Sequence, residues 1–155
     1  MKVVLETSAL ISALRSGSGA AAEIVRLAAT GKLTLLLDYK LVCEYRDVAL
    51  RPEHLAASGK SPEDVEAVIA LLEAIATPVQ VLVKHRPLSR DAHDDMVLDV
   101  AINGFADAVV TNNLRDFASA AARFGILALT SRDLLSVRRK REFHHANESE
   151  KNRGQ

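Results

Sequence analysis

The sequence contains a single cysteine, Cys43, among its 155 residues. One cysteine cannot form an intramolecular disulfide, and zinc sites built from several cysteines are excluded; we expect Cys43 to fill a small apolar space. Long apolar runs are missing, and so is a charged-then-apolar leader, so the sequence predicts a cytoplasmic protein without a membrane partner. Basic and acidic residues balance at 20 each. No overall charge therefore attracts nucleic acid, and an anionic substrate would have to be recognised locally.

Short apolar segments alternate with segments in which apolar residues have a helical repeat. The strand-like segments are residues 3–5, 32–37, 79–83, 107–111 and 125–130. Between them, apolar residues recur every three or four positions, as on the buried face of a helix. Strands that are separated by helices form parallel sheets covered on both faces. The sequence therefore predicts an α/β fold, a three-layer sandwich with a central, mainly parallel sheet.

Residues with capping chemistry mark the ends of several predicted helices. Ser18, Asp38 and Ser61 each precede a helical segment, where a short polar side chain accepts a hydrogen bond from the first turn. Gly31 and Pro52 follow helical segments, and both residue types are common just past a helix end.

The C-terminal segment differs in composition from the rest of the chain. A short helix is expected from Ser131, and residues 138–155 are polar, charged and nearly free of aliphatic side chains. Such a segment buries too little apolar surface to fold on its own, so we expect a mobile tail. The sequence thus divides into one domain, residues 1–137, and a tail, residues 138–155. Four consecutive basic residues, 138–141, either contact phosphates or are a solvated helix end.

Three acidic residues lie where predicted strands end or a predicted helix begins, and a fourth, Glu44, lies within a predicted helix. Glu6 directly follows the first strand, Glu44 borders an apolar helix stripe, Asp94 opens a helix, and Asp116 follows the strand at residues 107–111. Each has an ordinary structural explanation as a helix-terminal charge, a solvated flank or a turn residue. Ligands of parallel sheets bind outside the carboxyl ends of the strands. Several carboxylates without a histidine or cysteine framework favour Mg²⁺ or Mn²⁺, so Glu6 either caps a helix or binds a cation.

Four short motifs carry these acids. VVLETSALISAL includes Glu6, CEYRDVALRP includes Glu44, and DDMVLDVA includes Asp94, with Asp95 as its neighbouring alternative. The fourth motif, VVTNNLRDF, ends with Asp116 and Phe117. Together, over about residues 1–135, these motifs resemble those of the PIN domain ribonucleases, many of which are toxins of bacterial toxin–antitoxin pairs. The family has an aspartate where this chain has Glu6.

The resemblance implies a metal-dependent endoribonuclease that uses Mg²⁺ or Mn²⁺ to cut RNA. It also implies a small antitoxin protein as a partner and is compatible with a homodimer. The implied catalytic residues are Glu6, Glu44, Asp94 and Asp116, of which Glu6, Asp94 and Asp116 are the metal ligands. The implied supporting residues are Thr7, Ser8, Asp95, Thr111 and Asn113. The basic residues considered for the RNA backbone are Arg46, Arg90 and Arg115.

Glu6 is the one departure from the family pattern among the four acids. Glutamate keeps the charge of aspartate but adds a methylene, which moves the carboxylate by about a bond length, and Mg²⁺ tolerates little geometric error. Three interpretations of Glu6 follow: it binds metal through a water, it binds metal weakly, or it marks a domain that has lost its chemistry. The alternative function is a catalytically weakened or inactive PIN-fold protein that binds RNA or another protein.

Overall fold

The computed structural model describes residues 1–85, 89 and 91–153. Its strands form one sheet in the order β3-β2-β1-β4-β5, and every neighbouring pair is parallel. The strands are β1 (Lys2–Leu5), β2 (Thr34–Leu37), β3 (Thr77–Pro78), β4 (Ala108–Val110) and β5 (Leu127–Leu129). Because β1 is central, the residues that follow β1 and β4 emerge side by side at the carboxyl edge of the sheet.

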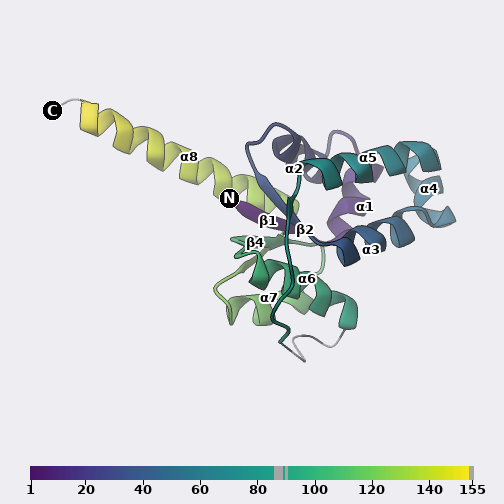
Figure 1. Cartoon of the computed structure of the whole chain (residues 1–155). Helices are drawn as coiled ribbons and strands as arrows, with labels where there is room; N and C mark the ends of the chain where they lie inside the picture. The colour runs from purple at the N-terminus through teal and green to yellow at the C-terminus, as the bar shows by residue number, and fades with distance from the viewer. Residues whose placement is uncertain (86–88, 90, 154–155) are drawn as a thin grey trace.

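Helices connect the strands and cover both faces of the sheet (Figure 1). They are α1 (Thr7–Arg15), α2 (Ala20–Ala29), α3 (Tyr39–Ala49), α4 (Pro52–Ser58), α5 (Pro62–Ile75), α6 (Ala92–Asn103), α7 (Leu114–Ala122) and α8 (Ser131–Arg153). On one side α1 packs against α2 and α3, and α2 contacts α5 and α8. On the other side α6 covers β1, β2 and β4 and packs against α7. The predicted α/β sandwich with a parallel central sheet is confirmed.

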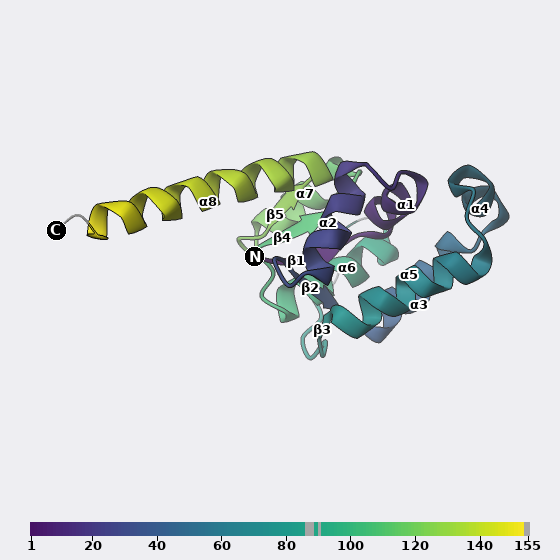
Figure 2. The same ribbon diagram turned by 90° about the horizontal axis from the view of Figure 1, so that it is seen from above.

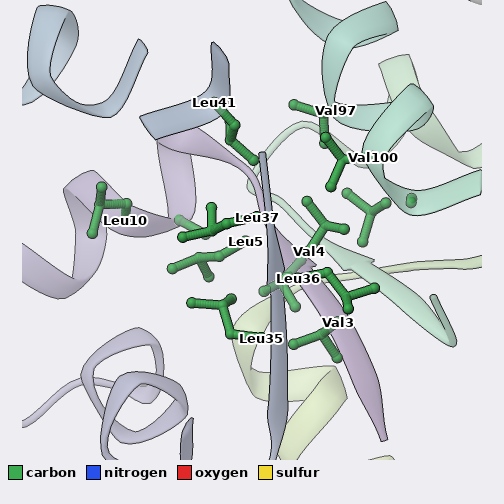
Figure 3. Packing of buried hydrophobic residues seen from close by; sticks show 14 of the residues in the cluster. Val3, Val4, Leu5, Leu10, Leu35, Leu36, Leu37, Leu41, Val97 and Val100 are labelled. Carbon is green, nitrogen blue, oxygen red and sulfur yellow. The ribbon is translucent and has the colours of Figure 1, made fainter. Parts of the chain in front are cut away.

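The core is built from both faces of the central strands. Leu35 and Leu37 lie on the side of Leu10, which belongs to α1, whereas Leu36 lies on the side of Val100 from α6 (Figure 3). All five of these side chains are buried. Continuous burial of successive residues is what a parallel strand covered by helices on both faces requires. The uninterrupted apolar run in β2 therefore indicates a strand that is buried on both faces.

The prediction of a strand at residues 79–83 is wrong. The strand at this edge is only Thr77–Pro78, although the amide of Val79 still donates to the Leu37 carbonyl at 2.7 Å. The amides of Leu82 and Val83 instead donate to the side-chain oxygen of Asn103, each at 3.0 Å. Leu82 is 75% exposed, so the apolar pattern here does not report the core. The side chain of Asn103, at the end of α6, thus accepts the hydrogen bonds that a neighbouring strand would accept in a sheet.

The predicted helix caps are confirmed at two of three places. Asp38 accepts a hydrogen bond from the Leu41 amide at 2.8 Å, and Ser61 forms a capping box. The prediction for Ser18 is wrong, because α2 begins one residue later and has Gly19 as its N-cap, which has no side chain to cap with.

Two further features differ from the sequence prediction. Cys43 is exposed, so it is not the expected apolar filler; α3 buries the face of Leu41, Val42 and Tyr45, and Cys43 lies outside it. Pro52 does more than end a helix, since it also begins α4. Proline fits the first helical turn, where no partner for its missing N–H is needed.

The last helix is much longer than predicted. Instead of a short helix from Ser131, α8 has 23 residues and continues through Arg153 (Figure 1). Leu134 is fully buried near its start, and the helix then projects away from the body in both views (Figure 2). The polar segment to residue 153 is thus helical, while the division of the chain at residue 137 stays a prediction. Within the described residues no helix combines the length and apolarity needed to span a bilayer.

Candidate active site

The motifs that follow β1 and β4 meet at the carboxyl edge of the sheet. Leu5 pairs with Val110 in the parallel ladder, and the Glu6 amide donates to the Val110 carbonyl at 2.9 Å. Glu6 and Thr111 are therefore the first residues beyond two adjacent strands. Tyr45 of α3 supports this edge from beneath, since its buried hydroxyl donates a hydrogen bond to the Leu5 carbonyl.

The Glu6 carboxylate is engaged in hydrogen bonds within the chain. Glu6 is the N-cap of α1, and its Oε1 accepts from the Ser8 amide at 3.0 Å. Its Oε2 accepts from the Thr111 hydroxyl at 2.9 Å and from the Ser8 hydroxyl. The extra methylene lets the side chain fold back over the first turn of α1. The capping role is therefore observed, and the role as a metal ligand stays a prediction.

Two hydroxyl groups connect Glu6 to the loop after β4. Ser8 Oγ accepts from the Asn112 amide at 3.0 Å, and Thr111 Oγ1 accepts from the Asn113 amide at 2.9 Å. Each hydroxyl thus receives a backbone N–H and donates its own proton to Glu6 Oε2. Thr111 is fully buried, so this arrangement holds the two loops in one geometry. Ser8 and Thr111 thus contact Glu6, and their predicted role as orienting groups at a metal site stays a prediction.

The side-chain amide that bridges the two motifs belongs to Asn112. Its Nδ2 donates to the Ser8 carbonyl at 3.1 Å and to Ser12 Oγ at 2.8 Å. Asn113, the residue predicted for an orienting amide, is the exposed N-cap of α7 and makes no side-chain cap hydrogen bond. Sequence spacing could not separate these two adjacent asparagines, because the direction of each depends on the loop conformation.

Asp94 has a raised pKa because it is partly buried and lies near several other acidic residues. It lies in the first turn of α6, and its pKa is raised from 3.8 to about 6. Burial is the largest cause, followed by repulsion from Asp91, Asp116, Glu6 and Glu44. Like charges that crowd together favour protonation of one of them unless a cation is present. The structure thus brings all four predicted acids into one electrostatic neighbourhood.

Glu44 reaches this neighbourhood from α3 and is mostly buried. Its side chain is 15% exposed, and Oε1 lies 3.3 Å from Nδ1 of His93, a residue that the sequence did not single out. Burial raises the pKa of Glu44, whereas His93 and the nearby Thr7 hydroxyl lower it in part. Glu44 Oε2 and Thr7 Oγ1 are buried and have no hydrogen-bond partner within the described residues. Such unsatisfied oxygens are costly unless a water or an ion completes them.

The donor set has the chemistry of a site for a hard divalent cation. Carboxylate and hydroxyl oxygens are the ligands that Mg²⁺ and Mn²⁺ prefer, and Mg²⁺ keeps several waters when it binds. In the described part of the chain, however, no three histidine, cysteine, aspartate or glutamate side chains are grouped closely enough to hold an ion directly. The oxygen donors therefore suit a hard cation by their chemistry, and a metal site stays a prediction.

Two neighbouring clefts divide the acids between them. One has a volume of about 1010 Å³ and is lined by Asp91, Asp94 and Asp116 together with Arg115 and Arg123. The other has a volume of about 410 Å³ and is lined among others by Glu6, Thr7, Ser8, Glu44 and Asn112. The larger cleft is thus lined by both carboxylates and arginines.

Two residues from the sequence prediction, Asp95 and Arg46, make contacts outside the two clefts. Asp95 is 5% exposed and its Oδ1 accepts from the Ser89 amide at 2.6 Å, so it braces the segment before α6 and lines neither cleft. Arg46 is paired with Glu66 and Glu73 at 3.0 and 2.9 Å and lines neither cleft. Arg90 lies outside the described residues.

The model of a family described as "PIN domain" matches residues 2–115. This chain belongs to the PIN domain family. Seven chains of solved structures match it. One is from the crystal structure of VapBC2 from Rickettsia felis bound to a DNA fragment from their promoter, with 14% identity and a TM-score of 0.57. That match covers 84% of this chain and 98% of the other, and it shows that the two share the PIN domain fold. No curated protein matches.

Proposed function

We propose that this PIN domain is a metal-dependent endoribonuclease that hydrolyses single-stranded RNA. The observation that carries the proposal is the environment of Asp94. Its pKa is raised to about 6 by burial and by acids from three other segments of the chain. A divalent cation would relieve that repulsion, and the membership in the PIN domain family supports nuclease chemistry at this edge of the sheet.

The proposed roles follow from where the side chains lie. A bound Mg²⁺ or Mn²⁺ would activate a water and offset the charge that develops on the phosphate. Glu6, Asp94 and Asp116 would hold it, directly or through water, and Glu44 would bind a further water at its unsatisfied oxygen. Arg115 lines the larger cleft and would contact the RNA backbone there.

Cleavage of a labelled single-stranded RNA tests the proposal. We expect cutting with Mg²⁺ or Mn²⁺, none with EDTA, and none by Asp94→Asn, which removes a ligand charge but keeps the shape of the side chain. Asp47→Asn is the matched control, because Asp47 is an exposed acid on α3 that pairs with Arg51. If Asp94→Asn cuts as fast as Asp47→Asn, Asp94 has no place in the reaction.

We also propose that the chain is the toxin of a toxin–antitoxin pair. Its fold matches a structure of VapBC2, and the PIN domain family resemblance implies a small antitoxin. A cytoplasmic location and a homodimer belong to the same proposal. Co-expression with the product of the neighbouring short reading frame should yield a complex and relieve toxicity. A chain that is harmless alone and recovers no partner would remove the toxin assignment and leave the nuclease assignment in place.

One observation favours a second candidate, a weakened PIN-fold protein that binds RNA or a protein partner. The Glu6 carboxylate already accepts from the Ser8 amide, the Ser8 hydroxyl and the Thr111 hydroxyl. Glu6→Asp shortens the side chain and should weaken this capping. If the site is a working one limited by the longer carboxylate, Glu6→Asp should raise cleavage and metal affinity. If neither Glu6→Asp nor the parent cuts RNA with any metal, the second candidate replaces the first.

A further inference from the structure

A row of basic residues lies along α8, and none of them lines either acidic cleft. Arg132, Arg139, Lys140 and Arg141 are all exposed. None of them has an ion-pair partner in the part of the chain that the structure describes. Arg138 differs, because it pairs with Glu142 one turn later. The chain has no net charge, so these cations form a local excess rather than part of a general positive field.

Part of this row borders a cleft between α8 and the start of α2. The cleft has a volume of about 360 Å³ and is lined by Arg26, Arg132 and Arg139 together with Gly19. Arg26 is held there by Glu23 at 2.8 Å and by the Gly17 carbonyl at 2.7 Å. Gly19 caps α2 without a side chain, so the side-chain acceptor that usually satisfies a first-turn amide is missing. Arg132, Arg139 and the open start of α2 thus line one cleft.

An exposed aromatic side chain continues the same stripe of α8. Phe143 is 75% exposed, which is unusual for so large an apolar residue. Residues 132, 139 and 143 are spaced by seven and four, so the periodicity of a helix places them on one stripe about 16 Å long. We call Arg132, Arg139 and Phe143 the α8 stripe. It combines cations with an aromatic face on a helix that projects from the body (Figure 2).

Cations outside the acidic clefts would strengthen the attraction of RNA, and the α8 stripe supplies two of them. RNA carries one negative charge per nucleotide, and the carboxylates around Asp94 repel it wherever no metal offsets them. Arg115 and Arg123 line the larger cleft, and Arg46 is paired with two glutamates, so cations outside the clefts would add to the attraction. Proteins that bind single-stranded nucleic acid without sequence preference combine cations along the backbone with aromatic side chains on which bases stack.

We propose that the α8 stripe is a binding site for single-stranded RNA outside the carboxylate clefts, with Arg132 and Arg139 on phosphates and Phe143 stacked on a base. The identity of the ligand as RNA rests on the proposed function. The binding itself requires no cleavage, so it is measured without metal.

The test is fluorescence anisotropy of a labelled oligouridine with the full-length protein in EDTA, over a series of salt concentrations. In single strands each lost phosphate contact lowers the slope of log affinity against log salt by about 0.7, which is about fivefold in affinity at about 0.1 M salt. We expect the double variant Arg132→Gln with Arg139→Gln to bind about 25-fold more weakly and to lose about 1.4 from the slope. Phe143→Ala should weaken binding at least about fivefold and leave the slope unchanged.

Two further variants separate specific contacts from charge and from folding. Arg51→Gln with Lys60→Gln makes the same charge change at the α4 end of the molecule, far from α8 in Figure 2, and should change affinity less than about twofold. Arg132→Lys with Arg139→Lys should keep most of the salt slope, because the charges remain. Melting temperatures near that of the parent would show that each variant is folded.

Several results would overturn the proposal. One is a parent protein that does not bind oligouridine, and another is an Arg132→Gln, Arg139→Gln variant that binds oligouridine as tightly as the α4 control does. A third is binding of an acidic protein by the α8 stripe while the stripe variants bind RNA with the same affinity as the parent. Failure of the proposed function looks different. In that case the parent binds RNA through the stripe in EDTA but does not cut it when Mn²⁺ is added.

Discussion

Asp94→Asn should stabilise the metal-free protein at neutral pH even though it removes the proposed activity. The Asp94 carboxylate is partly buried among Asp91, Asp116, Glu6 and Glu44, and this raises its pKa to about 6. The ionised form is therefore strained in the folded state. Asparagine has nearly the same shape but no charge, so the repulsion disappears in the variant.

The size of the effect follows from the pKa. One pKa unit corresponds to about 1.4 kcal/mol, so a rise from 3.8 to about 6 sets an upper limit of about 3 kcal/mol on the strain. Asp94 is only half-buried, and solvent screening reduces this figure to about 1 kcal/mol. For a chain of this length that amounts to about 2–4 °C in melting temperature.

The sign of the pH dependence is set by linkage. A carboxyl group whose pKa is raised on folding contributes stability that is fully present below its unfolded pKa, near 3.8, and is lost as pH rises through about 6. The advantage of Asp94→Asn over the parent should therefore be near zero at about pH 4 and largest above about pH 7.

Thermal unfolding in EDTA at a series of pH values measures this difference. Asp47→Asn is the control, because an exposed surface acid should change stability by less than about 0.5 kcal/mol. Adding Mn²⁺ should raise the melting temperature of the parent and leave Asp94→Asn unchanged, because ligands stabilise only the state that binds them. A variant that melts at or below the parent near neutral pH would refute the idea that the acids repel one another.

Three further predictions concern the residues that hold the site in place. Thr111→Val should lower the free energy of unfolding by about 1–2 kcal/mol because a buried hydroxyl relay is lost, whereas Thr111→Ser should keep most of it in chemical denaturation. Gly104→Ala should cost about 1–3 kcal/mol because a Cβ there would lie 2.7 Å from a Leu36 methyl, whereas at Gly17 the same change meets nothing within 4 Å and should be nearly neutral. Tyr45→Phe should cost about 1–2 kcal/mol by leaving a buried carbonyl unsatisfied, and a cost below about 0.3 kcal/mol would show that this hydrogen bond does not support the edge.

The sequence was most informative where burial is continuous. Leu35, Leu36 and Leu37 are apolar because both faces of β2 are covered, and an uninterrupted run of this kind indicates a parallel strand. Asp38 and Ser61 mark helix starts because their short side chains bond the first turn within a few residues. These are local effects, so the pattern of residues is enough to identify them.

The wrong predictions depend on contacts that are distant in sequence. Residues 79–83 have a strand-like composition. Two of their amides, however, donate hydrogen bonds to the side chain of Asn103, which lies 21 and 20 positions further along the chain. The length of α8 also escaped prediction, since a polar segment carries no apolar repeat from which a helix end can be located.

The candidate site shows the same division. Spacing placed Glu6 and Thr111 beyond strand ends, and the parallel pairing of β1 with β4 brings them together. The choice between Asp94 and Asp95 could not be made from spacing, because successive helical residues point in different directions. In the structure Asp94 lines a cleft and Asp95 accepts a hydrogen bond from the Ser89 amide, and the choice of Asp94 as the metal ligand stays a prediction.

A calorimetric titration of Mn²⁺ tests the central claim most directly, namely that the acids around Asp94 form one site for a divalent cation. It is carried out on the parent, Asp94→Asn and Asp47→Asn at about pH 7.5, and on the parent again below about pH 6, where the Asp94 carboxyl is protonated. The account predicts saturable binding by the parent and by Asp47→Asn, at least about tenfold weaker binding by Asp94→Asn, and a loss of parent affinity at the lower pH. Equal Mn²⁺ affinity in the parent and Asp94→Asn would contradict it.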